Sequence, residues 1–363
     1  MTTPEDAYQT LARIFSSRKD KVLEIEIIPS ALGSSFLEDS LSIGITKKAL
    51  VQAYVIARHL FAQHFLPMSE DKFMIYLESE NRVEEQSDLV ITEVMLLFDC
   101  EHLTACNWRK RRLQAALRHS LNTGERLSST LQMLETELTL MTTYQCSPLH
   151  RHTKSPTLWS HRLWVLRQLV LLRHSNAEAL LELVRAELNC VLRAAELHPK
   201  NYYAFNYMRQ LCAVLAKSAT DIKDGSFWTV ELARALIYPL LDWCLRNPRD
   251  ISGWIFGKYL LSHIPDRQVR ADIVSRVLRF ARDVGWEGES VWTFIDQSLR
   301  EFDLESVAEG IITLNEEVQI PPGLNQRTPQ SWAWQARLAR AKAHWAVHEE
   351  GNDLWWLTPN TRL

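Results

Sequence analysis

The sequence predicts an all-α protein, built as an alpha-alpha superhelix (a solenoid) of helical hairpin repeats. A segment with an aromatic and a basic residue recurs along the chain, long stretches place apolar residues at helical spacing, and only 11 of 363 residues are glycine. The recurring segment is centred on Cys106, Trp159, Phe205 and Trp254, which we term the key residues, at intervals of 53, 46 and 49 residues. Hairpins repeated at such a period stack on their neighbours and commonly offer a surface to a partner.

The region 1–87 is expected to be an N-terminal extension, because all thirteen tryptophans lie at or after Trp108. Within it, residues 22–30 alternate apolar and polar side chains, which predicts a short extended piece ending at Pro29. Residues 45–66 place apolar side chains at helical spacing and predict a helix with one apolar face. Residues 67–87 end in polar side chains, which favours a linking segment between the N-terminal extension and the repeats.

Helix pairs are expected from 88 to 350, followed by a C-terminal tail at 351–363. Ser175 and Glu178 predict a capping box, and Pro199 and Pro248 mark helix ends. Late helices are expected at 267–284, 288–301, 303–317 and 329–349. The repeat cores are placed near 98–121, 146–174, 196–216 and 244–264, with a degenerate one near 329–349 around Trp332, Trp334 and Arg337.

Each repeat pairs its key residue with a basic residue three or four positions later. An aromatic at the start of the second helix can fill the gap between stacked hairpins, and a buried tryptophan covers about 200 Å². The basic residue either clamps carbonyl groups at the ends of neighbouring helices or contributes to a concave basic surface. The change in spacing from three to four turns this residue by roughly 100° around the helix, so different roles are expected. These basic residues are Arg109, Arg162, Arg209 and Lys258.

Composition excludes several classes of protein. The formal net charge of −3 gives no global basic field for nucleic acid. Six scattered cysteines form no CxxC pair and are expected to be buried thiols in a reducing compartment. Neither a secretory signal nor an uncharged apolar stretch of roughly 18 residues is found, so we expect a cytoplasmic protein without a membrane span.

The repeats resemble those of protein prenyltransferase alpha subunits, whose usual pattern is Asn-Tyr-x-x-Trp-x-x-Arg. The segment NYYAFNYMR carries this pattern with Phe205 in place of tryptophan and with Arg209 displaced by one position. The segment SPTLWSHRLW has Ser155-Pro156 in place of Asn-Tyr. The resemblance covers about 22–265 and is strongest at 146–209. The chain looks most like a third alpha-type subunit, beside those of farnesyltransferase and Rab geranylgeranyltransferase.

The resemblance implies a chain that wraps around a separate beta subunit of the Rab geranylgeranyltransferase type. That beta subunit would hold the catalytic zinc and most of the isoprenoid pocket, while this chain would bind no cofactor or metal itself. Lys154 would contact the isoprenoid diphosphate, where an ammonium stabilises the charge of the departing group. Lys200, Asn201 and Tyr202 would face the same substrate from the next repeat. The implied acceptor is a SNARE that already bears one lipid and receives a geranylgeranyl group.

Other side-chain groups were weighed against this interpretation. The stretch 150–152 could widen a positive rim beside Lys154 or lie in a solvated loop. The run 109–112 could serve as a nuclear-import patch or face solvent or a partner. His344 and His348 have the spacing of a metal pair but no third ligand. Without a self-sufficient catalytic motif, the competing interpretation is a helical-repeat adaptor that binds peptides or proteins without prenyl transfer.

Overall fold

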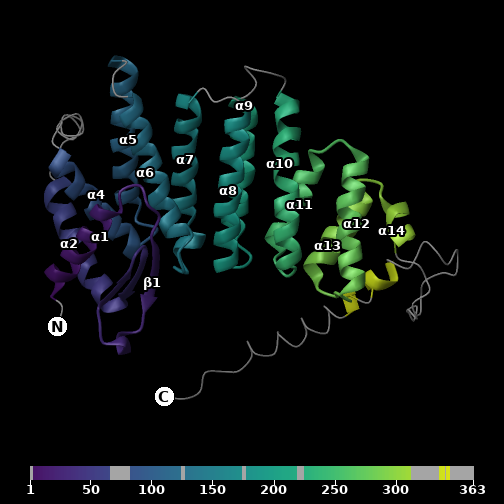
Figure 1. Cartoon of the computed structure of the whole chain (residues 1–363), viewed down its shortest axis with the longest axis horizontal. Helices are drawn as coiled ribbons and strands as arrows, with labels where there is room; N and C mark the ends of the chain where they lie inside the picture. The colour runs from purple at the N-terminus through teal and green to yellow at the C-terminus, as the bar shows by residue number, and fades with distance from the viewer. Residues whose placement is uncertain are drawn as a thin grey trace. The chain divides into compact units, whose positions relative to one another are not determined.

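The computed structural model describes residues 3–65, 82–123, 127–173, 177–218, 225–311, 335–339 and 341–343. The chain separates into two compact units, Met1–Ile222 and Lys223–Leu363, which are described individually. Helices dominate both units in the described residues, so the predicted all-α repeat fold is confirmed (Figure 1). No helix among these residues is both long enough and apolar enough to cross a bilayer.

The first unit combines a small mixed α/β region with three helix pairs. The pairs are α4 with α5, α6 with α7 and α8 with α9, and α7 also packs against α5 and α9. The elements are α1 (Pro4–Arg18), β1 (Glu24–Ile28), η1 (Ser30–Leu32), β2 (Phe36–Asp39), β3 (Ser42–Thr46), α2 (Lys47–Phe65), α4 (Arg82–Phe98), α5 (Leu103–Thr123), α6 (Leu127–Gln145), η2 (His152–Lys154), α7 (Pro156–Arg173), α8 (Ala177–Leu197) and α9 (Tyr202–Ser218).

The N-terminal region contains more structure than the sequence predicted. The expected extended piece at 22–30 is β1, and the helix expected at 45–66 is α2. Strand β3 lies between β1 and β2, parallel to β1 and antiparallel to β2. The sequence reading missed β2, β3 and helix α1. Helix α1 begins with a capping box, in which Thr3 and Asp6 each accept a hydrogen bond from the other's backbone N–H at 3.1 Å.

This region is built into the first repeats. One continuous apolar core runs from Ala7 to Leu158 and crosses residue 87, where the extension was expected to end. Strand β1 lies against the C-terminal half of α6: the backbone N–H of Leu23 donates to Thr143 Oγ1 at 3.0 Å, and that of Ile25 donates to Ser147 Oγ at 2.8 Å. These side-chain hydroxyls satisfy the backbone donors of two buried residues along the edge of a sheet whose strands β1 and β2 are otherwise mostly exposed.

The second unit continues with paired helices. Helix α10 (Gly225–Arg246) packs on α11 (Ile251–Ser262), α12 (Arg267–Asp283) packs on α13 (Glu289–Glu301), and α14 (Glu305–Ile311) packs on α12 and α13. Asp250 and Asp266 cap α11 and α12 by accepting hydrogen bonds from backbone N–H groups of the first turn.

The structure shows a repeat that the sequence reading did not recognise. The indole N–H of Trp292 donates to the carbonyl of Trp286, six residues earlier, at 2.6 Å. Trp159 and Trp254 make the same bond to the carbonyls of Thr153 and Pro248, at 2.9 and 3.0 Å. Trp292 is therefore the key residue of the α12–α13 pair.

Several expectations fall outside the described residues. These are Ser175 of the expected capping box, most of the link at 67–87, the tail at 351–363, and the degenerate repeat near 329–349 apart from 335–339 and 341–343.

Candidate functional site

The second helices α7, α9 and α11 each begin at a capping residue four positions before the key residue. Ser155 Oγ accepts from the N–H of Leu158 at 3.1 Å, and Asn201 Oδ1 accepts from the N–H of Ala204 at 3.2 Å. Asp250 caps α11 in the same register. Ser155 therefore performs the capping role of the asparagine in the prenyltransferase pattern, and Pro156 occupies the first helical position, where proline is favoured.

The key aromatic residues are buried and contact the following repeat. The ring of Trp159 lies 5.0 Å from that of Tyr207, and the ring of Trp254 lies 5.0 Å from that of Phe294. Phe205 is also fully buried. A tryptophan in this position therefore fixes the stacking of two hairpins, as expected of a residue that fills the gap between them.

Arg109 and Arg162 are buried clamps between repeats. Arg162 Nε and Nη2 donate to both carboxylate oxygens of Glu187 on α8, at 2.7 and 2.8 Å. Its Nη1 donates to Thr142 Oγ1 on α6 at 2.9 Å. Arg109 forms the same fork with Glu137, at 2.8 and 2.6 Å, and reaches Thr92 at 2.8 Å. Each guanidinium thus joins the first helix of its own repeat to that of the next.

The other two basic residues have different surroundings. Arg209 is partly exposed on α9. Lys258 Nζ reaches Gln297 at 3.0 Å and Glu301 at 2.8 Å, both on α13, in a partly exposed ion pair. The change of spacing from three to four accompanies this change of role. The backbone carbonyl that Arg109 reaches, that of Leu89 at 3.2 Å, lies within α4 and not at its end, so the contacts described here do not include the expected clamps on helix-end carbonyls.

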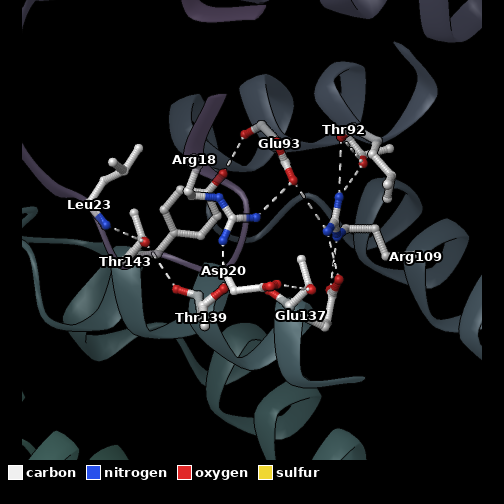
Figure 2. A network of polar contacts seen from close by, with 12 residues as sticks. Arg18, Asp20, Leu23, Thr92, Glu93, Arg109, Glu137, Thr139 and Thr143 are labelled. Atoms are coloured by element: carbon white, nitrogen blue, oxygen red, sulfur yellow. Dashed lines mark hydrogen bonds and ion pairs between the residues drawn. The ribbon is translucent and has the colours of Figure 1, made fainter. Parts of the chain in front are cut away.

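A buried polar network lies beside the clamp from Arg109 to Glu137, as Figure 2 shows. Glu93 lies between two guanidinium groups, 3.3 Å from Arg18 and 3.6 Å from Arg109. Burial raises the pKa of Glu93, although the two arginines act against this shift. Arg18 also donates to Thr139 on α6 at 2.7 Å. The network ties helix α1 to α4 and α6, so its role is in assembly of the unit.

The clamp partner Glu137 also holds a histidine. Glu137 Oε1 lies 2.7 Å from His161 Nε2 on α7. Burial alone would lower the pKa of His161, but the neighbouring side chains of Cys106 and Glu137 raise it to about 9. The buried imidazole is therefore cationic at neutral pH. In the next repeat, Tyr207 occupies the equivalent position and donates to Glu187.

This histidine predicts a pH dependence of stability. A folded-state pKa of about 9, above the ordinary 6.5, gives a stabilising contribution that is fully present below pH 6.5 and is lost as the pH rises through 9. We expect the free energy of unfolding to fall by about 2–3 kcal/mol across that window. Urea titrations at pH 6 and pH 9.5 would measure it. The His161→Gln variant should show a smaller fall, and an equal fall would assign the effect elsewhere.

Lys154 lies at the end of η2, in a loop that neighbouring side chains hold in place. The carbonyl of Thr153 accepts hydrogen bonds from Trp159 Nε1 at 2.9 Å and from Asn201 Nδ2 at 2.7 Å. Ser155 Oγ donates to the carbonyl of Cys100 at 3.1 Å. Three consecutive repeats therefore fix the backbone on both sides of Lys154, whose own side chain is partly exposed.

Two histidines gather beside Lys154. The rings of His150 and His198 lie 4.3 Å apart in an edge-to-face arrangement. Burial, followed by the charges of Lys154 and His150, lowers the pKa of His198. Lys154, His150 and His198, which we term the basic edge, lie on the α6–α7 and α8–α9 loops. The sequence reading missed His198, although a Leu-His pair precedes the lysine in both loops, at 149–150 and 197–198.

His152 does not belong to the basic edge. It is buried, its Nε2 lies 2.9 Å from the carbonyl of Leu96, and burial lowers its pKa to about 4. The wider positive rim considered for 150–152 is therefore confined to His150 and Arg151. Arg151 is exposed and lies 3.8 Å from Asp99.

The residues expected to face the substrate from the next repeat differ in their burial and in their contacts. Asn201 is fully buried, and both ends of its amide are occupied by the cap and by Thr153. Tyr202 is exposed at the start of α9. Lys200 is exposed and has a φ of +60°, in the left-handed region that disfavours residues with a side chain. The basic edge and exposed Lys200 and Tyr202 thus form the candidate site.

Because Lys200 has a left-handed backbone, two substitutions there can separate the effect of backbone strain on stability from the effect of losing the charge. Replacing Lys200 by glycine should raise the free energy of unfolding by about 0.5–1 kcal/mol, because glycine adopts this conformation without strain. Replacing it by alanine removes the same charge but keeps the strain. Denaturant titrations of both variants would measure the difference, and equal stabilities would contradict the strain.

No group of three histidine, cysteine or acidic side chains suited to a metal ion occurs within the described ranges. His344 and His348 lie outside them. The ammonium groups of Lys154 and Lys200 suit an anionic ligand such as a phosphate or diphosphate.

Comparison with known proteins points in the same direction as the repeats. Residues 163–281 match the family model of the ECM9 middle domain. The chain is 25% identical over 209 residues to Protein prenyltransferase alpha subunit repeat-containing protein 1 of Danio rerio, over 54% of this chain and 42% of that relative. The chain thus spans less than half of the relative's length. This protein is therefore a helical-repeat chain similar, over about half of its own length, to a protein with prenyltransferase alpha-subunit repeats.

Proposed function

We propose that this chain is the alpha-type, non-zinc subunit of a protein prenyltransferase. The observation that carries the proposal is Lys154, partly exposed on a loop that three repeats hold in place, with two histidines beside it. A cation fixed in position before the reaction stabilises developing charge without the cost of reorganisation. The similarity of the repeats to those of a prenyltransferase alpha-type protein supports the same assignment.

The proposed chemistry is shared between two chains. Lys154 binds the diphosphate of the isoprenoid and stabilises the negative charge that develops as the carbon–oxygen bond breaks. Lys200 adds a second positive charge at the same edge. The partner beta subunit, of the Rab geranylgeranyltransferase type, supplies the zinc that activates the acceptor cysteine and the apolar pocket for the isoprenoid. The proposed group is geranylgeranyl, and the proposed acceptor is a SNARE that already bears one lipid.

Association with the beta subunit tests the proposal. The chain and a Rab geranylgeranyltransferase beta subunit, each purified, would be mixed at micromolar concentration and separated by size exclusion with light scattering. We expect a 1:1 complex. Two separate peaks, from chains shown by circular dichroism to be folded, would remove the proposal.

A helical-repeat adaptor without prenyl transfer is the second candidate, and the charge pattern of the helix pairs favours it. The second helices α5, α7 and α9 contain no aspartate or glutamate. Helix α5 exposes Arg111 and Arg118, α7 exposes Arg167, and Lys110 lies over the ring of Trp164 at 5.1 Å. This basic row, next to first helices that carry the acidic residues, would suit an acidic polypeptide segment.

Two measurements separate the candidates. The adaptor predicts salt-dependent binding of an acidic peptide that is lost in the Arg111→Glu/Arg118→Glu variant, with no affinity for geranylgeranyl diphosphate in the presence of the beta subunit. The prenyltransferase subunit predicts binding of geranylgeranyl diphosphate by the complex, weakened in Lys154→Ala and retained when the α5 arginines are replaced.

A further inference from the structure

Two thiols meet at the junction between the second and third repeats. Cys146 follows the last turn of α6, and Cys190 lies within α8. Their sulfur atoms are 3.4 Å apart, and Cys146 Sγ also lies 3.6 Å from the carbonyl oxygen of Cys190. A disulfide bond is about 2.05 Å long, so the sulfur atoms have to approach by roughly 1.4 Å for a bond to form.

The two thiols differ in their access to solvent. Cys146 is partly exposed, whereas Cys190 is buried. The positive charge of Arg162 favours the thiolate form of both cysteines, and the negative charge of its partner Glu187 acts against it. A hydrogen bond between the thiols lowers the pKa of Cys146 and raises that of Cys190. The more accessible thiol of the pair, Cys146, is thus also the one better suited to react first.

We propose that Cys146 and Cys190 form a reversible disulfide that locks the junction between the second and third repeats. With a glutathione-type disulfide as oxidant, the Cys146 thiolate attacks one sulfur of the oxidant and releases one glutathione thiolate. The Cys190 thiol loses its proton and attacks the Cys146 sulfur of the mixed disulfide, releasing the second glutathione. Two protein thiols are oxidised, and one glutathione disulfide is reduced to two thiols.

The proposed disulfide would cross a junction that two hydrogen-bonded contacts already span. Both the clamp from Arg162 to Glu187 and the bond from Asn201 to Thr153 cross this junction, and the second of these bonds holds the loop of Lys154. A covalent link between the end of α6 and α8 would fix the spacing of the same two repeats. The inference rests on the thiol geometry and does not depend on the proposed function.

The test uses the full chain under native conditions. Reduced protein would be equilibrated in glutathione buffers of increasing oxidised fraction, quenched with N-ethylmaleimide in denaturant so that buried thiols also react, digested and analysed by mass spectrometry. We expect the loss of two alkylatable thiols, a cross-linked peptide pair containing residues 146 and 190, and complete reversal by dithiothreitol. The midpoint of thermal unfolding should rise by about 5 °C or more in the oxidised protein.

Three variants make the result decisive. Cys146→Ser and Cys190→Ser should each abolish the cross-link and the thermal shift. Cys212→Ser, which removes a buried thiol on α9, should retain both. If a variant folds poorly, the peptide map of the unchanged chain still decides the question. A glutathione adduct that persists on Cys146 without the cross-link, or six thiols that remain alkylatable, would overturn the proposal.

Discussion

Replacing Arg162 by alanine should lower the free energy of unfolding by about 3–5 kcal/mol, because the substitution leaves a buried carboxylate without its partner. Arg162 satisfies both oxygens of Glu187 and also reaches Thr142, so one side chain joins three helices. Urea unfolding followed by circular dichroism would measure the loss. The effect is expected to be comparable in Arg109→Ala, which removes the equivalent fork onto Glu137.

An exposed ion pair in the same unit provides the control. Arg193 lies 3.2 Å from Glu24, and both side chains are about half exposed. Arg193→Ala should therefore cost no more than about 1 kcal/mol. If Arg162→Ala and Arg193→Ala have equal effects, the buried fork does not hold the repeats together.

Replacing Lys154 by alanine should reduce prenyl transfer by the assembled complex about 100-fold, the usual effect of removing one donor that stabilises a developing negative charge. Steady-state transfer of geranylgeranyl to the acceptor would measure it. Assembly with the beta subunit should be unchanged, because the hydrogen bonds that hold this loop involve the backbone of Thr153 and the side chain of Ser155.

Two further variants distinguish charge from general damage. Lys154→Arg keeps the positive charge and should recover part of the lost rate. Arg193→Ala removes an equal charge from an exposed position and should leave the rate unchanged. Full activity in Lys154→Ala, with assembly intact, would exclude the diphosphate role.

The repeats were predictable from sequence where a tryptophan and its spacing recur. Trp159 and Trp254 were recognised for this reason, and both are buried between hairpins. Trp292 was missed because it follows Trp254 by 292 − 254 = 38 residues, a shorter interval than the others, and because Asp296 stands at the position of the basic residue. The bond from its indole to a carbonyl six residues earlier reveals the shared geometry.

The partners of the arginines could not be predicted from local patterns. Glu137 and Glu187 each stand in an apolar helical stretch, where spacing alone cannot distinguish a buried acid from an exposed one. Their burial follows from the stacking of repeats about 50 residues apart in sequence. Both glutamates precede a leucine, TEL at 136–138 and AEL at 186–188, but AEL also occurs at 195–197 around the exposed Glu196, so this pattern does not identify a buried acid.

The position of the candidate site was predictable from the sequence, but the roles of its individual residues were only partly predictable. The resemblance placed Lys154 and Lys200 on neighbouring loops, and both side chains are accessible there. Asn201 was expected to face the substrate, but a helix needs its first N–H groups satisfied, and this side chain supplies that cap. The strands β2 and β3 were missed because each is only four or five residues long and gains its stability from tertiary packing.

Transfer of labelled geranylgeranyl by the complex reconstituted from purified chains is the most direct test of the proposed function. The protein would be combined with a Rab geranylgeranyltransferase beta subunit, zinc, geranylgeranyl diphosphate and a singly lipidated SNARE. We predict incorporation into the acceptor cysteine only when both chains are present. Incorporation no greater than with the beta subunit alone, from a chain shown to be folded, would contradict the assignment.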